Sequence, residues 1–214
     1  MRDDGRLEER RERPSPPVWV TIGEAPLREP PIVPGYRLVH WERLRLGRLS
    51  LLGLLSMPLW AMAFTGVAAA LGGPRQYALV VTPRAIVVGL LLLFVVVPLL
   101  HEAVHGLLAW LLGARPSFGI GAGFAYTTFR APVGRRAYAA ICLAPLVVLS
   151  VAGVAVMVAW PQGAMATLVV LVGNASGAVG DLWMAWRLRT VPPDARLYDL
   201  ADGFAVLAPE PGQV

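Results

Sequence analysis

The stretch AIVVGLLLLFVVVPLLHEAVHGLLAWLL, residues 85–112, decides the fold of this chain. It contains only three ionisable side chains, His101, Glu102 and His105. A helix needs about 20 mainly apolar residues to cross the hydrocarbon core of a bilayer, whereas an apolar stretch of about 10–14 residues is typical of a helix buried in a soluble protein. The length and composition of this stretch therefore predict a transmembrane helix.

Three further apolar stretches of similar length lie at residues 49–71, 137–160 and 164–186. Of the 214 residues in the chain, 56% are hydrophobic and 15% are charged, and the mean hydropathy is +0.59. Soluble domains have a charged fraction of about 25%. The sequence therefore predicts an all-α membrane protein with four transmembrane helices, and it excludes an ordinary soluble domain.

The segments outside the spans are polar or irregular. Residues 113–136 include the run FGIGAGFAY, which is too irregular for a spanning helix and too apolar for an ordinary loop, so we expect a re-entrant or hairpin segment between the second and third helices. Alternating Leu, Trp and Arg in residues 36–48 predict a short interfacial helix at the lipid headgroups. The expected organisation is a disordered cytoplasmic tail (1–35), this interfacial segment (36–48), a four-helix transmembrane domain (49–187) and a second cytoplasmic tail (188–214).

The basic residues indicate an orientation in the membrane. All 19 are arginine, and only Arg75 and Arg84 lie on one side of the predicted spans, with the other 17 on the opposite side. Because cytoplasmic segments carry an excess of basic residues, we expect a multi-pass protein of the cell membrane with both termini in the cytoplasm. The net charge of +5 does not indicate nucleic-acid binding, because the arginines of the central region lie only in the gaps between the spans.

The charged side chains within the spans are Glu102 and Asp181. Such a group costs about 2.5–3.5 kcal/mol at the centre of a membrane helix, which favours a functional role. Glu102 lies in His101-Glu-Ala-Val-His105, an H-E-x-x-H pattern that places two imidazoles one turn apart on one helix face. Both can bind one zinc ion while the glutamate acts as a general base. The alternative is a polar cluster that hydrogen-bonds between helices.

A catalytic zinc site needs a third protein ligand and one open position. The long metzincin pattern would continue with glycine and histidine where this chain has Leu108 and Leu111, so that form is excluded. After Glu102 the next glutamate is Glu210, near the end of the chain. Asp181 is therefore the predicted third metal ligand, and we expect its carboxylate within about 5 Å of both imidazoles. Its alternative role is that of a helix-terminal residue near the headgroups.

Small residues surround this aspartate in the fourth span. Asn174 and Ser176 have short polar side chains that are suited to bonding a peptide backbone or a ligating carboxylate, although simple packing explains them equally well. Three glycines at helical spacing are expected to let the fourth span approach the second closely: Gly173, Gly177 and Gly180.

Three prolines lie within the predicted spans. Pro98 precedes the histidine motif, and the backbone hydrogen bond that it removes is expected to kink the second helix and open space beside the motif. Pro58 in the first span and Pro145 in the third are expected to produce kinks and to have no part in the site.

Taken together, these motifs resemble those of the putative zincin peptidases, integral-membrane proteins distantly similar to site-2 intramembrane metalloproteases. The resemblance covers about residues 36–208, and it rests on H-E-x-x-H, Ala144-Pro145, Asn174-Ala-Ser-Gly, Gly180-Asp181 and the run YDLADGF at 198–204. It implies a zinc-dependent peptidase. In that comparison His101, His105 and Asp181 match the metal ligands of site-2-like enzymes, and Glu102 matches their acid/base.

The sequence therefore predicts a membrane-embedded zinc metallopeptidase that hydrolyses peptide bonds near the cytoplasmic side of the membrane. The expected cofactor is Zn²⁺, and the expected partners are the lipid bilayer and a peptide or membrane-protein substrate, which would pair as an extended strand with residues 118–128. One alternative is a non-catalytic four-helix membrane module with a structural metal or polar cluster. Metal transport is a weaker alternative, because the first and third spans contain no charged residue and no histidine.

Overall fold

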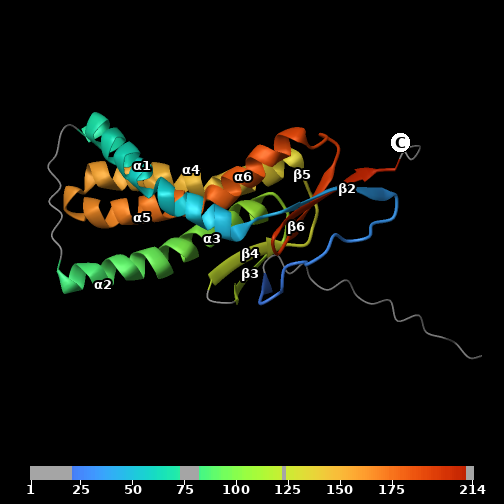
Figure 1. The fold of residues 1–214 in the computed structure, drawn as a ribbon, viewed down its shortest axis with the longest axis horizontal. Coiled ribbons are helices and arrows are strands. Elements are labelled where there is room, and N and C mark those ends of the chain that lie inside the picture. Colours follow the sequence, from blue (N-terminus) through green and yellow to red (C-terminus); the bar gives the residue numbers. More distant parts are fainter. Residues whose placement is uncertain (1–20, 73–81, 122–123, 211–214) are drawn as a thin grey trace, which may run out of the picture.

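The computed structural model describes residues 21–72, 82–121 and 124–210. Within these residues, four helical segments, each long and apolar enough to cross a membrane, form one end of the molecule, and two β-sheets lie at the other end (Figure 1). The prediction of four membrane-length helices is therefore confirmed. The chain is mostly helical but not all-α, which corrects that part of the prediction.

The four helical segments follow one another in chain order, and the second and fourth are each divided into shorter elements. They are α1 (Leu46–Gly72); α2 (Pro83–Leu91), the π-helical turn η1 (Leu92–Val96) and α3 (Val97–Leu111); α4 (Arg135–Ala159); and the 3₁₀ turn η2 (Pro161–Gly163), α5 (Ala164–Gly177), α6 (Val179–Arg187) and the 3₁₀ turn η3 (Leu188–Thr190). The irregularity expected near Pro98 takes the form of η1, which ends two residues before this proline.

The strands form two sheets at the end of the helices. They are β1 (Thr21–Ile22), β2 (Tyr36–Arg43), β3 (Pro116–Gly121), β4 (Phe124–Phe129), β5 (Val133–Gly134), β6 (Arg196–Leu200) and β7 (Gly203–Pro209). One sheet has the order β1-β3-β4 and the other the order β2-β7-β6-β5. The segment that was expected to be re-entrant or a hairpin contains β3 and β4, which pair in antiparallel register.

The interfacial helix predicted for residues 36–48 is wrong. Residues 36–43 form β2, which pairs with β7 in antiparallel register, and α1 begins only at Leu46. The residues of β2 do not alternate strictly, since Leu38 and Val39 are both exposed, and Trp41 packs against the cluster of Leu200, Ala205 and Leu207. The partner strand lies near the other end of the sequence, so no local pattern reveals the pairing.

Parts of both predicted tails also belong to the fold. The tail predicted from residue 188 onward contains β6 and β7, and Phe204 and Val206 of β7 are fully buried. In the predicted N-terminal tail, the carbonyl of Leu27 accepts a hydrogen bond from the Ala201 amide at 2.8 Å. The remaining parts of these tails, residues 1–20 and 211–214, lie outside the described residues.

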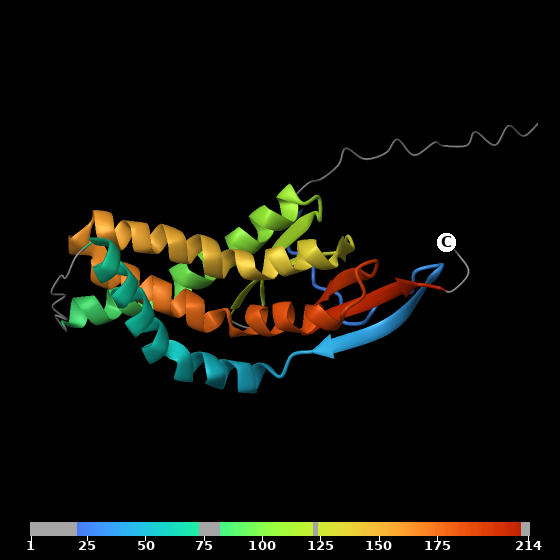
Figure 2. The ribbon, with the colours of Figure 1, turned by 90° about the horizontal axis from the view of Figure 1, so that it is seen from above.

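A shared hydrophobic core holds the sheets against the helices. Buried side chains from α3, α4, β4, β6 and β7 meet in one cluster, which includes Ala109, Phe129, Tyr138, Ile141, Leu197 and Phe204. The view from above shows β6 and β7 beside the end of α6 (Figure 2). The end of the helical bundle is therefore enclosed by strands, and this junction contains the predicted site residues.

Candidate metal centre

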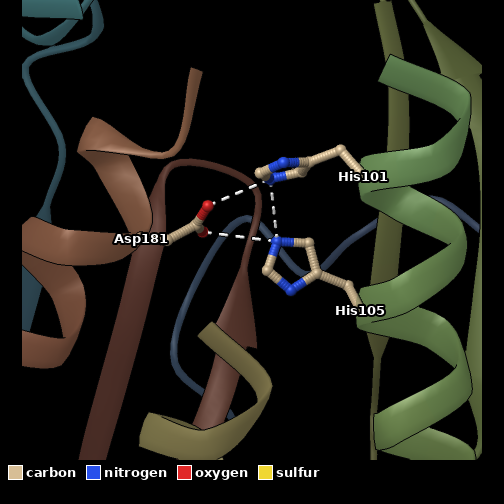
Figure 3. A group of neighbouring side chains, drawn as sticks. All are labelled: His101, His105 and Asp181. Carbon is tan, nitrogen blue, oxygen red and sulfur yellow. Dashed lines mark hydrogen bonds and ion pairs between the residues drawn. The ribbon is translucent and has the colours of Figure 1, made fainter. Parts of the chain in front are cut away.

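The two histidines of the motif and Asp181 meet between α3 and α6 (Figure 3). His101 Nε2 lies 3.0 Å from Asp181 Oδ2, and His105 Nε2 lies 3.4 Å from Asp181 Oδ1. The two Nε2 atoms are 3.1 Å apart. The three side chains are only 11–13% exposed. The expectation that Asp181 lies within about 5 Å of both imidazoles is therefore confirmed.

A break in the fourth helical segment places Asp181 at this point. The helix α5 ends at Gly177 and α6 begins at Val179, so that Asp181 occupies the first turn of α6. The helix dipole stabilises a negative charge in a first turn. The sequence predicts one continuous fourth span, because the residues around the break are small and apolar and include no proline.

Hydrogen bonds fix the orientation of both imidazoles. The Nδ1 atom of His105 lies 2.8 Å from the Ile141 carbonyl, which can only accept, so Nδ1 carries the proton. The Nδ1 atom of His101 lies 2.9 Å from the side-chain oxygen of Asn174, whose amide nitrogen donates to the Pro145 carbonyl at 3.1 Å. That oxygen also only accepts. In their neutral form, both rings therefore present the lone pair of Nε2 toward the same point.

This set of donor atoms fits a zinc ion. Two nitrogen lone pairs and a carboxylate converge within 4.8 Å of one another, and such groups repel unless a cation or a proton lies between them. In a tetrahedral zinc site with bonds of about 2.0–2.1 Å, neighbouring donor atoms lie about 3.3 Å apart. The observed separations of 3.0–3.4 Å are close to that value.

Glu102 lies beside this group on the wall of a cavity of about 570 Å³. Thr127 of β4 donates a hydrogen bond to the backbone carbonyl of Glu102 at 2.8 Å, which joins α3 to the sheet. The cavity is also lined by both histidines, Asp181 and three residues of the N-terminal segment: Ala25, Pro26 and Arg28. Glu102 therefore faces the same space as the three donor side chains without belonging to their group.

A second acidic side chain, Asp199 of β6, also lines the cavity. Its carboxyl accepts hydrogen bonds from the hydroxyl groups of Thr128 at 2.8 Å and Tyr138 at 3.0 Å. Burial raises the pKa of Asp199 to about 7, against the lowering effect of these two hydrogen bonds. The sequence gives no signal for Thr128 or Tyr138, because only the packing of β4 and α4 against β6 brings them to Asp199.

The small residues of the fourth segment have different roles. Asn174 is fully buried and bonds to His101, not to a carboxylate, whereas the Ser176 hydroxyl has no hydrogen-bond partner among the described residues. A side chain at Gly173 would come within 2.6 Å of Leu93, so this glycine does permit close approach of the second span. The other two predicted glycines, at 177 and 180, have open space beside them.

One of three comparisons with known proteins agrees with this site. The comparison with curated proteins and the comparison with solved structures gave no match. A family model described as putative zincin peptidase matches residues 93–196, and this description indicates a zinc-dependent metallopeptidase. The matched part includes α3 with its H-E-x-x-H motif, α4, and α6 with Asp181. Residues 93–196 of this chain, which contain all three donor side chains, are therefore similar to the putative zincin peptidase family.

Proposed function

We propose that this protein is a membrane-embedded zinc metallopeptidase that hydrolyses peptide bonds near the cytoplasmic side of the membrane. The observation that carries the proposal is the convergence of two imidazole nitrogens and a carboxylate beside Glu102 on the wall of one cavity. His101, His105 and Asp181 would hold the zinc ion. Zinc at this position would polarise the scissile carbonyl group and make a water molecule more acidic.

In this mechanism Glu102 transfers the proton. Its carboxylate accepts a proton from the attacking water molecule and then gives it to the amine that leaves as the peptide bond breaks. The hydrogen bond from Thr127 to the backbone of Glu102 fixes this turn of α3 against β4. The hydrogen bonds at Nδ1 of the two histidines keep their Nε2 atoms turned toward the cavity side of α3.

The number of donors favours a catalytic over a structural metal site. Structural zinc sites are almost always closed by four protein ligands, whereas catalytic sites have three and one open position. Among the described residues the group has three donors, and these line a cavity large enough for a peptide segment. The non-catalytic membrane module is therefore the weaker interpretation.

The sheet beside the site offers a place for an extended substrate. In the order β1-β3-β4, the strand β4 is at the edge, and Tyr126, Thr127 and Thr128 of this strand line the cavity. An extended peptide that adds to an edge strand satisfies its own backbone amides, which is especially valuable where water is scarce. We therefore place the substrate along β4, with its scissile bond next to Glu102.

The helical segments support a location in the membrane. All four are long and apolar enough to cross it, and their outer faces expose large apolar side chains such as Leu55, Phe94 and Val151 at 67–68%. The site lies next to the sheets, because Thr127 of β4, Asp199 of β6 and Gly203 of β7 line the same cavity. The distribution of arginines in the sequence supports assigning this end to the cytoplasmic side.

The variant Glu102→Gln tests this function. We expect it to bind zinc in the same amount as the unaltered protein, because Glu102 is not one of the three donors, and to cleave a quenched-fluorescent peptide library at least about 100-fold more slowly. Glu29→Gln, which changes an exposed glutamate, is the matched control and should alter neither quantity. Cleavage by Glu102→Gln at the unaltered rate would disprove the peptidase mechanism.

A further inference from the structure

Pro145 lies inside α4, and its side chain is fully buried. In an α-helix each backbone N–H donates to the carbonyl four residues earlier, but proline has no N–H. The carbonyl of Ile141, four residues before Pro145, therefore lacks its usual helical partner. This turn of α4 faces α3 and the cavity, since Ile141 itself lines the cavity.

His105 supplies the missing hydrogen bond. Its Nδ1 donates to the Ile141 carbonyl at 2.8 Å, and this bond determines which ring nitrogen carries the proton. If residue 145 had an N–H, the carbonyl would have a partner within the helix and His105 would have to compete for it. The other imidazole depends on the same turn, because the Pro145 carbonyl accepts from Asn174, which in turn holds Nδ1 of His101.

We propose that Pro145 is a positioning residue for metal binding, which reserves the Ile141 carbonyl for His105 and anchors Asn174 for His101. This inference rests on the proposed function only in that the two imidazoles bind zinc. It also reverses the expectation from the sequence that Pro145 produces a kink and has no part in the site. The proline in α1 provides a contrast: Pro58 is exposed, and no described side chain donates to the carbonyl of Leu54, four residues before it.

The variant Pro145→Ala separates positioning from a merely structural role. Alanine restores a helical N–H and is a far better helix former, so we expect the thermal unfolding midpoint to stay the same or rise. The zinc dissociation constant, measured by competition with a chelating dye, should increase about tenfold because His105 loses its fixed orientation. Pro58→Ala is the matched control, and its zinc affinity should equal that of the unaltered protein.

A second measurement does not depend on zinc. In metal-free protein labelled with ¹⁵N-histidine, the ring nitrogens of His101 and His105 should both show protonation at Nδ1. In Pro145→Ala the His105 signal should move toward a mixture of tautomers while the His40 signal remains unchanged. An unchanged zinc affinity together with an unchanged His105 signal would overturn the inference. A protein that shows these tautomers but cleaves no peptide would overturn the proposed function and leave the inference intact.

Asn174→Leu tests the second connection and does not alter the helix α4. It removes the amide that links the Pro145 carbonyl to His101, so we expect the protonation of His101 to change and that of His105 to persist. Zinc affinity should again fall about tenfold. If Asn174→Leu binds zinc as tightly as the unaltered protein, then the carbonyl of Pro145 does not position His101 and that half of the inference is wrong.

Discussion

The helices and the strands contribute different chemistry to the same cavity. The donor atoms, His101, His105 and Asp181, all come from helices. The strands contribute groups that line or support the rest of the wall, among them Thr127, Thr128 and Asp199. Helical residues are held by contacts between spans, whereas the strand residues come together only when β4 and β6 meet.

This difference implies that the two halves of the site can be altered separately. A substitution in the helices changes the donors and should change metal binding first. A substitution in the strands changes the charge, shape or stability of the cavity and should leave the donors in place.

The strongest test of the helical half is His105→Ala. Removing one of three donors from a buried site should reduce bound zinc to near zero, and peptide cleavage should disappear with it. His40→Ala is the matched control, since the side chain of this third histidine, on β2, is 40% exposed and lies outside the donor group. Zinc content of the purified proteins, measured by mass spectrometry, checks both. Equal zinc in the two variants would show that the helices do not hold the metal.

In the strand half, Asp199→Asn should change the dependence of stability on pH. Because burial raises the pKa of Asp199 to about 7, the fold favours its protonated form. Stability from this group is therefore complete at low pH and is lost as the pH rises through about 7, a loss on the order of 3 kcal/mol between pH 5 and pH 8. Asparagine resembles the protonated acid and cannot ionise, so the variant should lack this loss.

Thermal unfolding in detergent with EDTA, at several values between pH 5 and pH 8, measures this effect without a contribution from zinc. Asp194→Asn, which alters an exposed aspartate, serves as the control and should follow the unaltered protein. If the unfolding midpoint depends on pH in the same way for Asp199→Asn and for the unaltered protein, then the ionisation of Asp199 does not oppose folding.

At the contact between β2 and α6 we expect a smaller effect on stability, and here stability is lost as the pH falls. Glu42 accepts hydrogen bonds from Arg187 at 2.8 Å, His40 at 2.9 Å and Trp183 at 3.2 Å. Burial alone would raise the pKa of Glu42, but these three hydrogen bonds outweigh burial and lower the pKa below 4.5. The ionised carboxylate therefore stabilises the fold at neutral pH.

Glu42→Gln should reduce the free energy of unfolding by about 2 kcal/mol at pH 7. The difference from the unaltered protein should shrink as the pH falls through the lowered pKa of Glu42, because both side chains are then neutral. Unfolding in denaturant at pH 7 and at a series of lower pH values that continues well below pH 4.5 provides the measurement. Zinc content should remain unchanged, and a variant that lost its zinc would show that the sheet and the donors are coupled.

The features that could be predicted from the sequence are those that depend on neighbouring residues. Apolar runs show the four spans, and the spacing of His101 and His105 places both on one helix face. Asp181 follows by elimination, because it is the other carboxylate within a span. The break at residue 178 and the strand pairing of β2 with β7 were not predicted. Both depend on contacts between distant parts of the chain. The local sequence patterns are those of a continuous span around residue 178 and of an interfacial helix at β2.

The role of Pro145 was misjudged for a related reason. A proline in a membrane span predicts a missing hydrogen bond, but the sequence does not show which side chain will use the carbonyl that becomes available. Likewise, Asn174 was expected to bond a peptide backbone or a ligating carboxylate, or to pack, and only the approach of α3 to α5 shows that it bonds His101. The types of residue in the sequence indicate a metal site, whereas the hydrogen-bond partners of Pro145 and Asn174 are seen only in the three-dimensional structure.

The N-terminal segment has a practical consequence for work with shortened chains. Composition suggests trimming the protein at about residue 35, yet Ala25, Pro26 and Arg28 form part of the cavity wall. Removing them would also deprive the Tyr126 hydroxyl and Arg130 of their contacts with Glu24. A protein cut there would keep every metal donor and still have an altered cavity. A shortened chain that begins before Thr21 preserves this wall, so kinetic comparisons are best made with that version.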